Sequence, residues 1–181
     1  MTQFFLVKLQ KHLKTRFLFN ILALGLLLFA SNLASAQVQS RAFQAVIESM
    51  LKKTVPTITV EEVKREENLI LLDTRAKAEF EVSHLKYARW IGYDDFNLSR
   101  MKGIRKDAPI VVYCSIGVRS EQIGEKLLKA GYKNVKNMYG SIFEWINQGN
   151  PVYDAKEQPT KKIHGFDKTW GIWCKGGEKV Y

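Results

Sequence analysis

The chain has 181 residues, which is enough for one ordinary domain with a hydrophobic core and short for two. Hydrophobic residues make up 46% and charged residues 25% of it, a balance typical of soluble globular proteins. The net charge is +10, but Lys and Arg form no run and aromatic residues are not interleaved with them, which argues against a nucleic-acid partner.

The first 36 residues resemble a secretory signal peptide. Four basic residues precede an apolar run over 17–33, which ends at the A-x-A site Ala34-Ser35-Ala36. Cleavage there makes Gln37 the first mature residue and lowers the net charge from +10 to +6. An uncleaved anchor is the rival interpretation, but the run is short for a bilayer span and contains three polar residues. We therefore expect an exported protein, periplasmic or secreted, with no stable membrane anchor after cleavage.

The mature chain alternates helices with strands. Apolar periodicity and the capping-box spacing of Thr59 and Glu62 predict helices, and continuous apolar runs predict strands buried on both faces. In chain order, we expect a helix over 41–53, a short helix over 59–67, strands over 69–72 and 88–91, a helix over 95–104, a strand over 109–113, a helix over 120–130, a strand over 135–138 and a helix over 142–148. This alternation implies a three-layer α/β domain on a mostly parallel sheet, with ligands bound outside the carboxyl ends of the strands.

A single cysteine, Cys114, stands where the strand over 109–113 runs into the next helix. The free amides and the dipole of the helix start make an anion cradle there, which also lowers the pKa of a thiol and favours the nucleophilic thiolate. Five amides, from 115 to 119, can ring one anionic sulfur, and Gly117 lets the backbone curl without a Cβ clash. Arg119 supplies a cation for the oxyanion part of a donor. The residues expected to bind the substrate are Ser115, Ile116, Gly117, Val118, Arg119 and Ser120.

Three charged residues upstream are expected to support this loop. Asp73 ends a strand, and Arg75 lies four residues before Glu79. We expect Asp73 to accept hydrogen bonds from loop amides and an Arg75–Glu79 ion pair to brace the loop. His84 is expected to be a hydrogen-bonded turn residue, because a thiolate needs no base to attack sulfur. The sequence has no C-x-x-C, H-E-x-x-H or Cys/His cluster, so we expect neither a metal nor another cofactor.

These motifs resemble those of single-domain rhodaneses. The matching segments are Leu72-Asp-Thr-Arg75, Glu79-Phe80, His84-Leu85, Cys114-Ser-Ile-Gly-Val-Arg-Ser120, Gly131-Tyr-Lys-Asn-Val135, Tyr139-Gly-Ser-Ile142 and Trp145. The resemblance covers residues 57–152, with a helical lead-in over 37–56 and an extension over 153–181. It implies an α/β/α rhodanese-like domain with a five-stranded sheet, and sulfurtransferase chemistry in which Cys114 carries a sulfane sulfur as a persulfide.

The chain departs from the family pattern at four places. Ser83 replaces a glycine before the histidine, Lys86-Tyr87 replaces Pro-Gly, and Gly140-Ser141 replaces paired glycines. Ser115 stands at a loop position that is often basic in active thiosulfate sulfurtransferases. This last change concerns the sulfur donor, whereas the fold is expected to be kept.

The expected partners are a small anionic sulfur donor such as thiosulfate and a thiol or cyanide-type acceptor, a protein thiol included. A phosphatase or arsenate reductase of related architecture is less favoured, because those loops place five residues between cysteine and arginine, whereas four separate Cys114 from Arg119. A third class is a carrier, binding or sensing module whose cysteine turns over little by itself.

Two features of the extension leave alternatives open. Cys174 can be an inert buried thiol, a disulfide partner of Cys114 or a resolving thiol, and the first is favoured because free cysteines are commonly small buried hydrophobes. Phe166, Trp170 and Trp173 stand at helical spacing, which predicts a short amphipathic segment docked on the domain. A partner-binding surface is the alternative for these aromatic residues.

Overall fold

The computed structural model describes residue 38 and residues 40–181, which belong to one compact unit. The predicted signal peptide over 1–36 and its cleavage site lie outside the described residues. Within the described part of the chain, no helix is long and apolar enough to cross a membrane.

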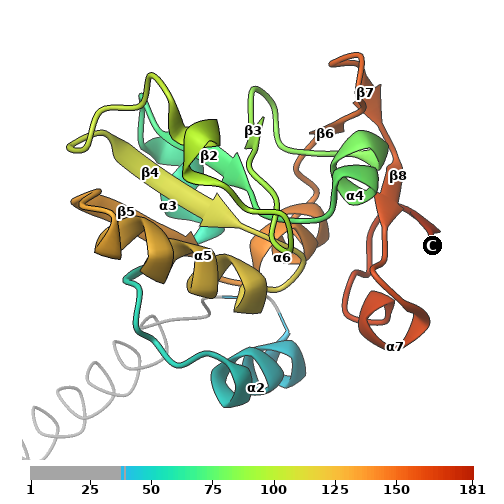
Figure 1. The fold of residues 1–181 in the computed structure, drawn as a ribbon. Helices are drawn as coiled ribbons and strands as arrows, with labels where there is room; N and C mark the ends of the chain where they lie inside the picture. Colours follow the sequence, from blue (N-terminus) through green and yellow to red (C-terminus); the bar gives the residue numbers. More distant parts are fainter. Residues whose placement is uncertain (1–37, 39) are drawn as a thin grey trace, which may run out of the picture. The chain divides into compact units, whose positions relative to one another are not determined.

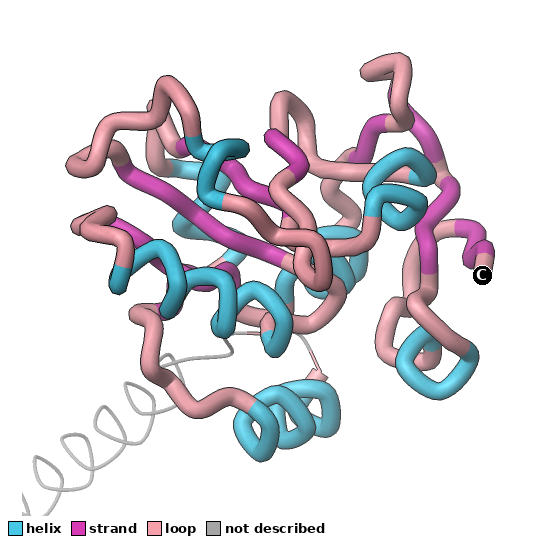
Figure 2. The backbone as a smooth tube through the Cα atoms, viewed as in Figure 1, coloured by secondary structure: helices cyan, strands magenta, loops and turns pink. Residues whose placement is uncertain are grey.

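Five parallel strands form the central sheet (Figures 1 and 2). They are β1 (Thr57–Ile58), β2 (Ile70–Asp73), β3 (Arg89–Trp90), β4 (Pro109–Tyr113) and β5 (Asn134–Met138). Their spatial order is β1-β5-β4-β2-β3, and every neighbouring pair is parallel. The central strand is β4, so the residue after Tyr113 lies at the middle of the carboxyl edge, where parallel sheets bind ligands.

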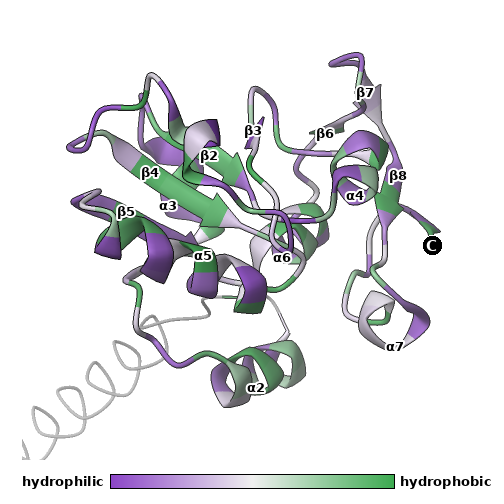
Figure 3. Cartoon of the chain, in the orientation of Figure 1, coloured by the Kyte–Doolittle hydropathy of each residue, from purple (hydrophilic) through white to green (hydrophobic). Residues whose placement is uncertain are grey.

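Helices cover both faces of the sheet, which confirms the three-layer prediction. They are α2 (Arg41–Met50), α3 (Val60–Arg65), α4 (Lys77–Val82), the 3₁₀ turn η1 (Leu98–Met101), α5 (Val118–Lys129) and α6 (Ser141–Asn147). Alternate side chains of β4, which Figure 3 colours mainly as hydrophobic, enter two separate cores. Ile110 and Val112 pack with residues of α5, whereas Val111 and Tyr113 pack with residues of α3 and α6.

Several local predictions hold in detail. The strand over 109–113 has the predicted bounds, and Thr59 and Glu62 form the predicted capping box at the start of α3. The helix after the cysteine begins at Val118, two residues before the expected start at Ser120. The first helix ends at Met50, earlier than expected, because Leu51 is already extended with ψ 134.

The predicted helix over 95–104 is wrong, since only the short η1 turn forms there. Asn97 accepts a hydrogen bond from the amide of Ser99 at 2.8 Å, which offers the backbone an alternative to an α-helix. Gly103 then takes a left-handed φ of 84°, which ends the turn. Met101 and Ile104 are nevertheless buried, so the apolar pattern correctly indicated which residues are buried but not a helix.

The extension folds back onto the domain, as predicted, but with more structure than the aromatic spacing indicated. It contains β6 (Val152–Tyr153), β7 (Pro159–Thr160), β8 (Lys162–His164), α7 (Lys168–Gly171) and β9 (Glu178–Val180). β6 and β7 pair antiparallel, and β8 and β9 pair parallel. Trp173 stacks on Phe43 of α2 with ring centroids 5.6 Å apart, and Ile163 is fully buried.

Candidate active site

Cys114 lies directly after β4, and the start of α6 holds its peptide groups in place. The Cys114 amide donates to the hydroxyl of Ser141 at 3.2 Å. The amides of Ile142 and Phe143 donate to the carbonyls of Cys114 and Ser115, each at 3.1 Å. The start of α6 therefore binds the carbonyls of the first two loop residues.

Gly117 makes the turn that brings an amide onto the sulfur. Its φ of 117° is a conformation that residues with a Cβ rarely adopt. Its amide donates to Cys114 Sγ at 3.1 Å, and its carbonyl accepts from Asn137 Nδ2 at 2.9 Å and from Ser120 Oγ at 3.1 Å. Among the described residues, no acceptor binds the remaining loop amides, those of Ser115, Ile116, Val118 and Arg119. These amides are available to a second anionic sulfur.

The surroundings of Cys114 favour its thiolate. Burial by itself raises the pKa of this thiol, which is only 1% exposed. The positive charge of Arg119 and the hydrogen bonds from Ser120 and Gly117 act in the opposite direction and outweigh burial, so the pKa lies below its ordinary value. The predicted nucleophile therefore has the electrostatic setting that its chemistry needs.

The ion pair that braces the loop differs from the predicted one. Glu79 does not pair with Arg75 but binds Arg119 with both carboxylate oxygens, at 2.7 and 2.8 Å. Arg119 also donates to Ser115 Oγ at 2.9 Å. Burial raises the pKa of Glu79, but the hydrogen bonds and charge of Arg119 outweigh it and lower that pKa. The Arg119 cation is thus shared between a buried carboxylate and the thiolate.

Arg75 is instead held by the aspartate two residues before it. The Arg75 Nη2 atom lies 2.6 Å from Asp73 Oδ2, both side chains are fully buried, and Nη2 also donates to the carbonyl of Ser83 at 2.6 Å. Asp73 accepts one loop amide, that of Arg75, at 2.9 Å. The pair stabilises the loop after β2 and does not line the pocket at Cys114.

His84 is the hydrogen-bonded turn residue that the sequence predicts. Its Nδ1 lies 2.9 Å from the carbonyl of Phe80, and its Nε2 lies 3.0 Å from Glu157 Oε1 in the extension. The ring stacks on Phe80 with centroids 3.9 Å apart. His84 therefore joins the extension to the domain, away from the pocket at Cys114.

Two of the departures from the family pattern keep a glycine-like backbone. Tyr87 has φ 60° and Ser141 has φ 53°, both left-handed, at positions where the family has glycine. Ser141 compensates with its hydroxyl, which accepts from Cys114 and donates to the carbonyl of Met138 at 3.1 Å. The fourth departure, Ser115, joins the Glu79–Arg119 pair, where the family often has a basic residue.

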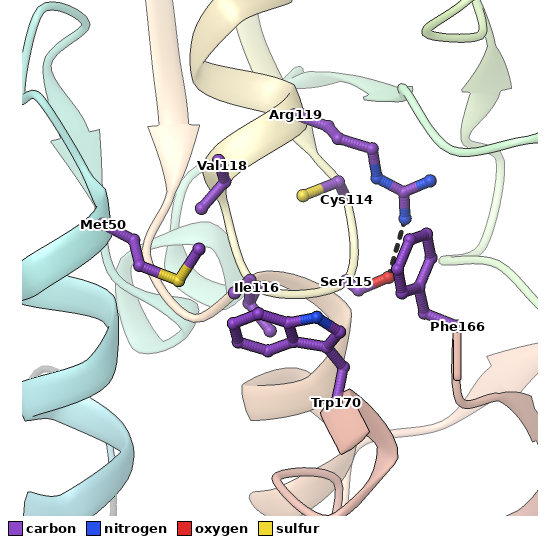
Figure 4. A pocket seen from close by; sticks show the side chains of 8 residues that line it. All are labelled: Met50, Cys114, Ser115, Ile116, Val118, Arg119, Phe166 and Trp170. Atoms are coloured by element: carbon purple, nitrogen blue, oxygen red, sulfur yellow. Dashed lines mark hydrogen bonds between the residues drawn. The ribbon is translucent and has the colours of Figure 1, made fainter. Parts of the chain in front are cut away.

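A pocket of about 160 Å³ opens over Cys114 (Figure 4). The loop residues Cys114–Arg119, apart from Gly117, form its floor, and Met50, Phe166 and Trp170 form its walls. Figure 4 shows the Cys114 sulfur directed into the space between Val118, Met50 and Trp170. The sequence prediction missed these three wall residues. Helical spacing marked Phe166 and Trp170 as packing residues, with a partner-binding surface as the alternative, but spacing alone does not say that they lie beside the thiol.

Cys174 fits the inert-thiol interpretation. It is fully buried, and both cysteines are free, so no disulfide joins it to Cys114. Burial raises the pKa of Cys174 to about 11, and its sulfur donates to the carbonyl of Gly176 at 3.3 Å. Over the described residues, no group of His, Cys, Asp and Glu side chains is arranged to hold a metal ion.

Comparison with known proteins assigns the family. Residues 59–148 match the model of the rhodanese-like domain. A sulfurtransferase from Allochromatium vinosum is 34% identical over 86 residues, which cover 48% of this chain and 79% of that protein. The chain therefore belongs to the rhodanese-like family, whose α/β fold with a parallel five-stranded sheet it shares.

Two further comparisons show how widely this domain is used. A tRNA uridine(34) hydroxylase from Hamiltonella defensa is 30% identical over 126 residues, but the match spans only 34% of that protein and 67% of this chain. The solution structure of a rhodanese-like domain from Anabaena sp. is 21% identical with a TM-score of 0.52, over 57% of this chain and 82% of that one. The second comparison supports the fold alone.

Proposed function

We propose that this chain is an exported sulfurtransferase that moves a sulfane sulfur from a small anionic donor, such as thiosulfate, to a thiol or cyanide-type acceptor. The observation that carries the proposal is the placement of Cys114 in a loop in which the Gly117 amide donates to its sulfur and Arg119 lowers its pKa. Membership of the rhodanese-like family and the sulfurtransferase relative support sulfur transfer as the general activity.

The proposed reaction has two steps at one sulfur. The Cys114 thiolate attacks the outer sulfur of thiosulfate, the S–S bond of the donor breaks, and sulfite leaves with the electron pair. The acceptor then attacks the outer sulfur of the persulfide, and Cys114 leaves as a thiolate. The loop amides that have no acceptor favour both steps if they donate to the negative charge on the outer sulfur.

The loop fits this chemistry better than phosphoryl transfer. Phosphatase loops of related architecture place five residues between the cysteine and the arginine, whereas four separate Cys114 from Arg119, which suits a single sulfur atom. A carrier module with little free turnover remains the second candidate, because Cys114 is only 1% exposed and a slow acceptor step is compatible with that burial.

Mass spectrometry of the mature protein before and after thiosulfate tests the proposal. We expect a gain of one sulfur, about 32 Da, on the peptide that contains Cys114. Cyanide should remove this mass and release thiocyanate. The Cys114→Ser variant should fold but gain nothing, since a serine hydroxyl stays protonated and forms no persulfide. A transfer rate near the wild-type value in Cys114→Ser would overturn the mechanism.

Export is tested separately, on the full-length chain expressed in a host that secretes proteins. We expect the exported product to begin at Gln37, as the A-x-A site over 34–36 predicts. A membrane-bound product that still carries its first 36 residues would instead support the anchor.

A further inference from the structure

The walls of the pocket over Cys114 come from segments outside the family domain. The family model matches 59–148, whereas Met50 belongs to α2 and Phe166 and Trp170 belong to the extension. Figure 4 shows the three side chains approaching the Cys114 sulfur from two sides. The family domain supplies the nucleophile, and the two flanking segments decide what reaches it.

These walls are apolar, and the charge at the pocket is already compensated. Of the described residues that line the pocket, Arg119 alone is cationic, and Glu79 binds both of its outer nitrogens. The ring of Phe166 lies 4.8 Å from the guanidinium carbon of Arg119 and covers it. A carboxylate on the substituent of an acceptor would lose its water against the apolar side chains of these walls.

Phe166 is held in place against a backbone preference. Its φ of 65° is unusual for a bulky residue, and such strain persists only where the surroundings fix it. The C-terminal Tyr181 packs over the glycines that flank the aromatic wall. A Cβ on Gly165 or on Gly171 would lie 2.6 Å from atoms of the Tyr181 ring or hydroxyl. The wall is therefore a built part of the site.

The size of the pocket limits the group that it accepts. Its volume of about 160 Å³ is close to that of an apolar protein cavity of about 150 Å³ that binds benzene. Cys114 is only 1% exposed, so an acceptor reaches it through this pocket, and a thiol on a flat protein surface does not.

We propose that the acceptor is a small thiol with a neutral, apolar substituent about the size of a benzene ring, seated between Met50, Phe166 and Trp170. This inference rests on the proposed sulfur transfer. The acceptor thiolate attacks the outer sulfur of the Cys114 persulfide and forms a new S–S bond. The bond between the outer sulfur and Sγ breaks, and Cys114 keeps the electron pair, so no oxidant or reductant is needed.

The test compares acceptors on protein that thiosulfate has already loaded with sulfur. Phenylmethanethiol, 3-mercaptopropionate and cyanide are mixed with the loaded protein, and mass spectrometry follows the loss of about 32 Da. With rates referred to the thiolate concentration, phenylmethanethiol should react at least about 10-fold faster than 3-mercaptopropionate, a difference of about 1.4 kcal/mol. Equal rates for the two thiols would overturn the inference.

Variants of the wall separate this inference from the proposed function. Trp170→Ala should reduce the preference for phenylmethanethiol over 3-mercaptopropionate to about 3-fold or less, with the rate of each thiol divided by the cyanide rate of the same variant. Met50→Gln should also reduce the preference between the two thiols. Because Met50 is 37% exposed, this substitution should be tolerated, and it serves as the test if Trp170→Ala does not fold. Ile172→Ala, on the same segment but 55% exposed and outside the pocket, is the matched control and should leave the preference unchanged.

Failure of thiosulfate to load Cys114 would reject the proposed function, whereas normal loading with a preference unchanged in both wall variants would reject only the apolar acceptor.

Discussion

At the scale of single residues, Arg119 has two negatively charged partners, and both stabilise its positive charge. The thiolate of Cys114 and the carboxylate of Glu79 both favour its cation, and Glu79 is only 3% exposed. The buried Glu79 holds the arginine beside the loop by two hydrogen bonds. The cation is thus a fixed part of the loop that lowers the pKa of Cys114 before any substrate arrives.

Arg119→Ala should therefore change the pH dependence of Cys114 chemistry. Only the thiolate reacts with iodoacetamide, so the alkylation rate rises with pH through the pKa of the thiol. Loss of the arginine removes the main influence that lowers this pKa, and the rise should move to higher pH. Sulfur transfer should fall on the order of 100-fold, as for the loss of one electrostatic contact in an active site.

Two variants control this experiment. Arg119→Lys keeps the positive charge and should shift the alkylation profile less than Arg119→Ala, which also leaves the buried Glu79 uncompensated. Arg105→Ala removes an exposed arginine paired with Asp107 and should leave the profile unchanged. An identical profile in wild type and Arg119→Ala would show that the arginine only braces the loop.

Cys174→Ala should retain most sulfur transfer. The thiol is fully buried with a pKa of about 11, so at neutral pH it is protonated and is a poor nucleophile. Steady-state transfer from thiosulfate to cyanide measures the effect, and titration should find Cys114 reactive in both proteins. A Cys114–Cys174 disulfide in non-reducing peptide mapping, with loss of activity on oxidation, would make the extension a redox switch instead.

At the scale of helices and strands, Cys114 is held in place by β4, the loop that follows it, α5 and the start of α6. α5 supplies the free amides and the dipole, and α6 holds the loop carbonyls from the other side. Ser141 links the two, because its hydroxyl binds the amide of Cys114 while its own backbone is left-handed at φ 53°. A residue with a side chain is thus accepted at a glycine position because the side chain itself makes a needed contact.

Substitutions at Ser141 test that balance. Ser141→Ala leaves the buried amide of Cys114 without its partner and should destabilise the fold by about 1–3 kcal/mol. Ser141→Gly loses the same contact but relieves the left-handed strain, so it should be more stable than Ser141→Ala by about 1 kcal/mol. Urea unfolding measures both, with Ser49→Ala on exposed α2 surface as a control expected within about 0.5 kcal/mol of wild type. Equal stability of the Ala and Gly variants would show that the strain is negligible.

The parts of the site that the sequence predicted are those that local pattern determines. The strand over 109–113, the turn at Gly117 and the thiol at the helix start depend on neighbouring residues alone. The partner of Arg119 could not be found in the same way, because Glu79 lies 40 residues before it in the sequence. Arg75, four residues before Glu79, was the nearer candidate to pair with this carboxylate. Arg75 is instead bound by the side chain of Asp73, which lies two residues before it.

The walls of the pocket were beyond local prediction for a related reason. Met50, Phe166 and Trp170 come from opposite ends of the described chain, and only tertiary packing brings them to one place. Helical spacing marked Phe166 and Trp170 as packing residues, but Phe166 and Met50 are exposed and only Trp170 packs against the core. That spacing gives the same signal for a core residue and for a residue in the wall of a binding site.

At the scale of the whole molecule, the part of the chain that folds as one unit is larger than the segment that matches the family. The match ends at 148, but Ile163 and Cys174 of the extension are fully buried in the core that contains Val111 and Tyr113. Trp173 stacks on Phe43, which belongs to the segment before the match. The two flanking segments therefore contact each other as well as the domain, and they complete the core on one face of the sheet.

A chain ending at Val152 should consequently lose more than the pocket wall. Each fully buried apolar side chain contributes about 1.5–3 kcal/mol, and the stability of a whole domain is about 5–15 kcal/mol. Removal of the fully buried Ile163 and of the partly buried Trp170 and Trp173 takes away part of that range and exposes Phe43. We expect the short chain to melt at a much lower temperature than the mature protein, or without a cooperative transition, in calorimetry. Glu157→Gln, which removes only the half-exposed partner of His84, should change stability by less than about 1 kcal/mol. A short chain that melts at the temperature of the mature protein would show that the family domain folds alone and that the extension serves the pocket only.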